Sequence, residues 1–189
     1  MYHIKEDLRA EKSAELLYEG LKQCLKDKEF DKVKILDITK ASTVSRATFY
    51  RNFDSVIDIL YWKCDQLFKQ VLSSYIETSP NINEADSLIR YIFSFWMNHI
   101  DILEILIKQS RIDIIFNSFI QNADIVMNYI YSITNISILN YDYFISTRVG
   151  IFIGMFQTWI KNGKKETIEE LISILNSHVR VIEDTGFIF

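Results

Sequence analysis

Residues 34–53 constrain the fold most, because they contain two helices that are too short and too close together for an ordinary helical hairpin. The first helix carries an apolar stripe and is followed by a short turn. Ser45 then opens a second helix, which buries Phe49 and Phe53 and leaves the residues between these rings facing outward. This pattern is typical of a helix-turn-helix with an exposed second helix.

The exposed residues of the second helix are of the types that contact duplex DNA. Arg46 can donate two hydrogen bonds to one guanine, and the methyl groups of Ala47 and Thr48 can touch thymine. Hydroxyl groups and neighbouring basic side chains suit phosphate oxygens. The predicted DNA-binding residues are Lys34, Lys40, Ser45, Arg46, Ala47, Thr48, Tyr50 and Arg51. The alternative is a helix-turn-helix-like corner of an ordinary helical protein, in which the arginines are merely solvated.

The same residues resemble the N-terminal signature of the TetR/AcrR family of bacterial transcriptional regulators. The resemblance lies in Asp37-Ile38, Val44 to Arg51 and Phe53, and it covers residues 8–60. Beyond them the chain is similar to the family in its length, its all-helical pattern and its ending from Trp159 to Gly163. The resemblance implies a DNA-reading domain followed by a helical body that dimerises and binds an effector.

Three residues depart from the pattern of the family. Thr43 stands where a glycine is usual in the turn, and Thr39 stands where an alanine is usual. Both predict a slightly altered turn. Val56 occupies a position where members of the family often carry a phosphate-binding lysine, so one backbone contact to DNA lacks its usual residue.

The charges of the chain are unevenly distributed. The net charge of −4 alone argues against a nucleic-acid partner. However, residues 1–53 hold 11 Lys and Arg against 9 Asp and Glu, whereas residues 54–189 hold 10 against 16. A basic first part on an acidic remainder is expected of a small DNA-reading domain that is joined to a domain with another task.

A scarcity of turn residues favours an all-α fold. The 189 residues include one proline and five glycines, which leaves little turn chemistry for β-hairpins. Charges interrupt every apolar segment, so no membrane span is expected, and the charged N-terminus has no signal-peptide core. The sequence therefore predicts a cytoplasmic, all-α protein.

Patterns of catalytic and metal-binding residues are absent from the sequence. His3, His99 and His178 have no carboxylate at the helical spacing of a metal site, and there is no glycine-rich phosphate loop or nucleophile elbow. Cys24 and Cys64 are expected to be free, packed thiols, since a redox sensor would need an exposed and activated thiol. We expect neither an enzyme nor a cofactor or metal site.

Hydrophobic periodicity predicts about nine helices in two domains. A helix-turn-helix domain is expected at residues 1–54, and an effector-binding and dimerisation domain at residues 55–189. Outside the motif, helices are expected over residues 7–27, 54–77, 84–100, 101–110, 112–133, 143–161 and 167–183. The helix at 54–77 contains no proline or glycine, so we expect it to act as a rigid lever between the domains.

Several of these helices carry end signals in the sequence. Ser45 is expected to cap the second helix of the motif, and Asp54 or Ser55 the helix that follows it. Gly163 is expected to end the helix at 143–161 in the left-handed conformation. Thr167 and Glu170 have the spacing of a capping box for the last helix.

The helix at 143–161 is apolar on nearly all sides, and such a helix must be buried on all sides. A second copy of this helix and of the last one would cover both in a four-helix interface, which the family resemblance also implies. Gly150 and Gly154 would let the helices approach closely. The predicted dimer residues are Gly150, Phe152, Phe156, Trp159, Leu171, Leu175 and Val179. The alternative is that the helix lies simply in the core.

Aromatic side chains are frequent in the middle of the chain. They either fill the core or line a pocket for an apolar or flat effector. The predicted lining residues, which rest mostly on the resemblance, are Trp62, Phe68, Tyr91, Phe95, Trp96, His99, Phe116 and Phe119.

The sequence therefore predicts a homodimeric, ligand-responsive repressor that binds a palindromic operator in double-stranded DNA. The main alternative is a coactivator or adaptor whose C-terminal domain binds a protein partner instead of a small ligand. An all-helical enzyme is the third alternative. An enclosed aromatic cavity would favour the first function, and a closed body without a cavity the second.

Overall fold

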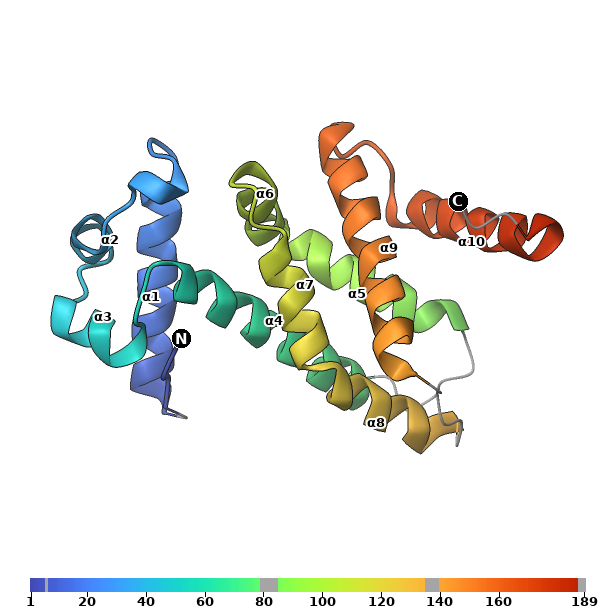
Figure 1. The fold of residues 1–189 in the computed structure, drawn as a ribbon, viewed down its shortest axis with the longest axis horizontal. Coiled ribbons are helices and arrows are strands. Elements are labelled where there is room, and N and C mark those ends of the chain that lie inside the picture. Colours follow the sequence, from blue (N-terminus) through green and yellow to red (C-terminus); the bar gives the residue numbers. More distant parts are fainter. Residues whose placement is uncertain (6, 79–84, 135–139, 187–189) are drawn as a thin grey trace. The chain divides into compact units, whose positions relative to one another are not determined.

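The computed structural model describes residues 1–5, 7–78, 85–134 and 140–186, and confirms the all-α fold (Figure 1). These residues form ten α-helices and one short 3₁₀-helix. The helices are α1 (Leu8–Cys24), η1 (Phe30–Lys32), α2 (Ile35–Ser42), α3 (Arg46–Asn52), α4 (Ile57–Thr78), α5 (Ala85–Asn98), α6 (Ile100–Lys108), α7 (Asp113–Gln121), α8 (Ala123–Thr134), α9 (Tyr141–Lys161) and α10 (Ile168–Thr185). Within the described ranges, no helix combines the length and the hydropathy needed to cross a membrane.

One predicted helix is two helices in the structure. The helix expected over residues 112–133 is divided at Asn122 into α7 and α8, which raises the number of helices to ten. The amide of the Asn122 side chain donates to the carbonyl oxygen of Ser118 at 2.8 Å, where it shares that acceptor with the backbone of its own residue. A side chain that competes for a helical carbonyl in this way favours a helix end. Residues 79–84 and 135–139 lie outside the described part. They fall in and beside the gaps at 78–83 and 134–142 between the expected helices.

The chain divides into two compact units. The first comprises Met1–Phe68 and Ile105–Asn122, and the second comprises Lys69–Glu104 and Ala123–Phe189. Both α4 and α6 contribute residues to each unit, and α4 is one uninterrupted helix, as predicted. The functional boundary expected between residues 54 and 55 stays a prediction, because compactness does not report function.

The first unit is built around the buried stripe of α1. Ala14, Leu17 and Leu21 are fully buried, in agreement with their helical spacing. The α2 and α3 helices pack against α1 and against each other, and Figure 1 shows them beside it. Burial of each large apolar side chain contributes about 1.5–3 kcal/mol, so this stripe holds the three helices together.

The second unit has an aromatic core. The rings of Phe93 and Phe156 stack with their centroids 5.3 Å apart, and Phe152 lies 4.7 Å from Phe156 and 5.6 Å from Trp96. Trp159 adds an edge-to-face contact with Phe156 at 6.0 Å. Such ring pairs prefer offset or edge-to-face geometry, and here they join α5 to α9.

Three of the four predicted end signals are present, whereas α4 begins at Ile57, so neither Asp54 nor Ser55 stands at its N-cap. The hydroxyl of Ser45 accepts from the amide of Thr48 at 3.1 Å, and Gly163 has a φ of +85° after the end of α9. The Glu170 carboxylate accepts from the amide and the hydroxyl of Thr167 at 2.7 and 3.0 Å, which completes the predicted capping box. Local side-chain chemistry therefore sets these boundaries.

Both cysteines are free thiols, as expected. Cys64 is fully buried in α4, and Cys24 is half-buried at the end of α1. Burial raises the pKa of each thiol, so both stay protonated at neutral pH. They therefore serve as packing groups in this structure.

The crossing of α1 and α2 requires Gly20. A Cβ atom at this position would lie 2.8 Å from the Cβ atom of Ser42 and 2.9 Å from the carbonyl oxygen of Ile38. We expect Gly20→Ala to lower the free energy of unfolding by about 1–3 kcal/mol. The clash exceeds the gain of roughly 1 kcal/mol in helix propensity because a backbone oxygen cannot swing aside.

Urea-induced unfolding measures this change. Gln23→Ala, at an exposed position one turn further along α1, is the matched control and should change the free energy of unfolding by no more than about 0.5 kcal/mol. A Gly20→Ala protein as stable as the Gln23→Ala protein would contradict the close approach of the two helices.

The turn between α2 and α3 is strained at Thr43. This residue has a φ of 58°, in the left-handed region that costs an ordinary residue about 1–2 kcal/mol. Glycine adopts this conformation freely, but its greater freedom in the unfolded chain destabilises the folded state by roughly 0.5–1 kcal/mol. We therefore expect Thr43→Gly to raise the free energy of unfolding by about 0.5–1 kcal/mol. Thr43→Ala keeps the strain and should give no such gain in the same measurement.

Candidate nucleic-acid interface

The helix-turn-helix predicted from residues 34–53 is present. In it, α2 ends at Ser42, and α3 begins at Arg46 after the turn. The Asp37 carboxylate accepts from the amide of Lys34 at 3.0 Å and so fixes the first turn of α2. The hydroxyl groups of Ser45 and Thr48 lie 3.0 Å apart at the first turn of α3. Side-chain hydrogen bonds thus order the start of both short helices.

Two buried rings orient α3. Phe49 and Phe53 are both 0% exposed, and their centroids lie 5.9 Å apart. Phe53 also makes an edge-to-face contact with Trp62 of α4, with a centroid distance of 6.1 Å. Because this face of α3 is committed to the core, the rest of its circumference must face away from it.

The predicted DNA-binding residues lie on that outward face and on α2. Tyr50 is 52% exposed, and Thr48 is half-buried beside its hydrogen bond to Ser45. The other residues of the predicted set are exposed, namely Lys34, Lys40, Ser45, Arg46, Ala47 and Arg51. The short helices therefore bring the whole set to the surface of one small motif.

The basic groups of the motif are available to an anion. Among the described residues, Lys34, Lys40, Arg46 and Arg51 take part in no ion pair, whereas the nearby Lys28 is paired with Asp37 at 2.9 Å. A cation without an ion pair need not break one to bind a phosphate, and each such contact releases counterions from the DNA. The motif is therefore suited to an anionic backbone as well as to base edges.

Residues 1–5, which we call the N-terminal strap, were not predicted to have a role. Tyr2 forms an isolated antiparallel bridge with Phe53, and the amide of His3 donates to the carbonyl oxygen of Asn52 at 2.8 Å. The amide of Asp54 donates to the carbonyl oxygen of Met1 at 3.2 Å. The strap thus pairs with the chain where α3 ends, and no periodicity in five residues could have indicated this.

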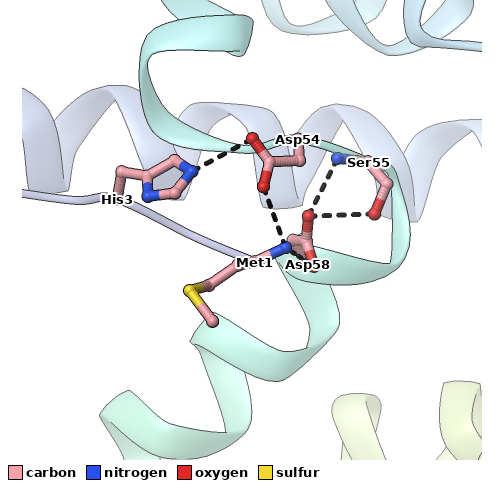
Figure 2. A network of polar contacts seen from close by, with 5 residues as sticks. All are labelled: Met1, His3, Asp54, Ser55 and Asp58. Carbon is pink, nitrogen blue, oxygen red and sulfur yellow. Dashed lines mark hydrogen bonds and ion pairs between the residues drawn. The ribbon is translucent and has the colours of Figure 1, made fainter.

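Polar contacts reinforce the strap at the start of α4 (Figure 2). The ring Nε2 of His3 lies 3.0 Å from Asp54, and the amino group of Met1 lies 2.9 Å from Asp58. His3, followed by this amino group, holds the pKa of Asp54 below its usual range. The Asp58 carboxylate also accepts from the amide and hydroxyl of Ser55, at 2.8 and 2.9 Å. Two carboxylates therefore flank Val56, the position at which the resemblance would place a lysine.

The residues predicted to line an effector pocket fall into two groups in different units. In the first unit, Phe68 makes an edge-to-face contact with Phe119 at 4.7 Å, and Trp62 packs on Phe53; Phe116 is half-buried. In the second unit, the ring of Phe95 lies 5.9 Å from Trp96 and 4.6 Å from His99, and Tyr91 contacts Tyr75 at 5.3 Å. Of the eight residues, Trp62, Phe68 and Trp96 are buried, and the other five are half-buried.

Two open hollows on the described surface contain none of these eight residues. One, of about 290 Å³, lies on α10 between Glu169 and Arg180. The other, of about 530 Å³, lies between α1 and the end of α2, from Leu16 to Thr43. The described residues also contain no group of three or more His, Cys, Asp or Glu side chains that could hold a metal ion.

Four of the predicted dimer residues pack inside the subunit, and their part in a dimer contact stays a prediction. Phe152, Phe156, Trp159 and Leu171 are buried within the subunit, with Phe156 only 2% exposed. Because α9 is apolar on nearly all sides, periodicity cannot choose between its faces. Leu175 is half-buried, and the side chain of Val179 lies outside the described part.

The opposite faces of α9 and α10 remain uncovered in the subunit. Gly150, Ile151 and Gly154 are exposed on α9, and a Cβ atom at either glycine would meet no atom within 4 Å. On α10, Ile174 is 39% and Val181 49% exposed. If a second copy binds these helices, it must meet this set of residues and not the buried rings.

Comparisons with known proteins identify the family. Residues 83–180, more than half of the chain, match a TetR family described as the C-terminal region of transcriptional regulators. The crystal structure of Lin0861 from Listeria innocua is similar with a TM-score of 0.81 and 16% identity, over 95% of this chain and 96% of that one. A TetR transcriptional regulator from Streptococcus agalactiae has a TM-score of 0.59 and 17% identity, over 89% and 94%. No curated protein sequence matches the chain.

The two solved structures share the fold of this chain, and the family match covers its C-terminal part. The helix-turn-helix signature at residues 34–53 lies outside the matched residues, and it resembles the same family. The chain therefore belongs to the TetR family of transcriptional regulators.

Proposed function

We propose that this regulator binds a palindromic operator as a homodimer and represses transcription until an effector binds. The observation that carries the proposal is the orientation of α3, whose buried rings leave Arg46, Ala47, Tyr50 and Arg51 exposed. We call α3 the recognition helix from here on. Side chains at its start would reach base edges in the major groove, and those further along would contact phosphates.

Dimerisation is supported by the exposed apolar face of α9 and α10. Ile151, Ile174 and Val181 are each more than a third exposed, and the two glycines of α9 leave room for a close helix contact. A two-fold dimer places two identical reading heads on DNA, so a palindromic site matches its symmetry.

A protein partner in place of a small effector is the second candidate. It is favoured by the packing of the predicted lining residues against one another, as in the pair of Phe68 and Phe119. A small effector would have to separate such rings, whereas an adaptor could bind its partner on the surface.

For an effector that releases the repressor, binding of effector and of operator are linked. The factor by which the effector weakens operator binding equals the factor by which the operator weakens effector binding.

The recognition helix can be tested by removing Arg46. If its guanidinium reads a guanine, Arg46→Ala should cost about 1–3 kcal/mol of binding free energy and relax the preference at one base position. The measurement is fluorescence anisotropy on a duplex that the parent protein has selected from a random-sequence library, together with single-base variants of that duplex. Unchanged affinity and base preference would contradict the assignment of the motif.

A phosphate contact of Lys34 can be tested through salt. Lys34→Ala should weaken binding to all duplexes alike and reduce the slope of log K against log salt by about one. Lys69→Ala, which removes another exposed lysine, on α4 and outside the motif, is the matched control and should leave the slope unchanged. Equal slopes for both variants would remove Lys34 from the interface.

The dimer face can be tested at Ile151. The parent should be a dimer at micromolar concentration, and Ile151→Glu should be a folded monomer, because an unpaired carboxylate in a dry interface costs several kcal/mol. Tyr131→Glu, at a residue of α8 that is 57% exposed, is the control and should stay dimeric. Sedimentation velocity measures the mass, and a monomeric parent would end the proposal of a dimer.

A further inference from the structure

Asp65 is a buried carboxylate at the centre of three polar contacts within the first unit. It lies on α4 and is 6% exposed. It accepts hydrogen bonds from the hydroxyl of Tyr2 at 2.7 Å, from the hydroxyl of Ser118, and from the side-chain amide of Asn122 at 3.3 Å. The three donors come from the N-terminal strap and from α7 with its C-cap, so one side chain of α4 joins two other parts of the unit.

The donors around Asp65 are all neutral. A buried carboxylate held this way depends on each of its hydrogen bonds, because the loss of one donor leaves part of its charge without a partner in a poorly solvated place. Burial, followed by the hydrogen bond to Asp65, raises the pKa of Tyr2, so the hydroxyl stays a donor at neutral pH. The position of the carboxylate is therefore set by donors from two sides, and the loss of a donor on one side leaves it free to shift relative to the other.

Tyr2 carries this connection to the recognition helix. Its hydroxyl reaches Asp65, and its backbone forms the bridge with Phe53, directly after the helix. On the next residue, the amide of His3 holds the carbonyl oxygen of Asn52, the last residue of the helix. The path from α7 to the end of the recognition helix is thus one of direct contacts.

The corner between α6 and α7 makes a second connection to the motif. The Arg111 guanidinium pairs with Asp31 at 2.8 Å and lies 5.6 Å from the ring centroid of Phe30. The side-chain carbonyl of Gln109 accepts from the amide of Phe30 at 2.9 Å. Both contacts reach η1, directly before α2. The segment from 109 to 122 therefore contacts the chain before the motif and, through Asp65, the chain after it.

We propose that Asp65 is a positioning residue, which fixes the end of the recognition helix to α7 through Tyr2 and the N-terminal strap. A displacement of α7 would loosen the strap and change the orientation of the recognition helix. The effect of this role on DNA binding rests on the proposed function. The physical coupling between α7 and the N-terminal strap through Asp65 does not.

The coupling can be measured in the DNA-free protein by amide hydrogen exchange, followed by NMR. Ser118→Ala removes a donor on α7 that does not touch the strap. We expect it to lower the protection of the amides of His3 and Asp54 by about fivefold, the factor expected for one hydrogen bond. Tyr2→Phe, which removes only the hydroxyl, should have the same effect on these two amides. The core amides of α1 report global unfolding and should change less.

Ser13→Ala is the matched control, since this serine of α1 donates, among the described residues, only to the carbonyl oxygen of Arg9 in its own helix, at 2.8 Å. It should leave the protection of the strap unchanged. Asp65→Asn keeps the shape of the side chain but alters the acceptor, so it should loosen the strap even if Ser118→Ala does not fold.

Protection of His3 and Asp54 that is equal in Ser118→Ala and Ser13→Ala would overturn the proposal, as would an equal loss in the strap and in α1. All measurements are made without DNA, so these outcomes are independent of the duplex titrations with Arg46→Ala. A motif that does not bind DNA would therefore be recognised separately from a strap that is not coupled to α7.

Discussion

The burial of Phe49 and Phe53 is the interaction on which the candidate interface depends. The recognition helix has seven residues, which is too short to be stable by itself in water. Its position is therefore set by packing, with two rings fully buried and a capped first turn. Removal of either ring would leave a cavity that costs about 3–5 kcal/mol, and the helix would lose its orientation together with its stability.

The first unit adds a buried polar centre to this apolar core. A core of rings tolerates small shifts, because dispersion and burial are non-directional, whereas hydrogen bonds to Asp65 require defined distances and angles. The centre thus gives α4, α7 and the strap one relative arrangement. The corresponding cost is that a carboxylate with no cationic partner among the described residues is held away from water. This combination is expected where a protein needs a defined position more than it needs stability.

Features that depend on neighbouring residues in the chain could be predicted from the sequence. Three helix-end signals act within one helical turn, and all three are present in the structure. They are the cap at Ser45, the left-handed Gly163, and the capping box of Thr167 and Glu170. The outward face of α3 followed in the same way from the spacing of its two rings. The division at Asn122 could not be predicted, because it depends on one side chain that binds its own helix and a distant carboxylate.

The face of an all-round apolar helix and the contacts of the strap depend on tertiary structure in the same way. Periodicity showed that α9 must be covered on most sides, but not which side the subunit covers. The rings of Phe93 and Trp96 on α5 select Phe152 and Phe156, and this leaves the glycine face outward. An effector faces the same packing: if rings such as Phe68 and Phe119 must part to admit it, its apparent affinity falls by the fraction of molecules already open. A protein partner on the surface avoids this penalty, so the packing of the body bears directly on the choice between the two modes of regulation.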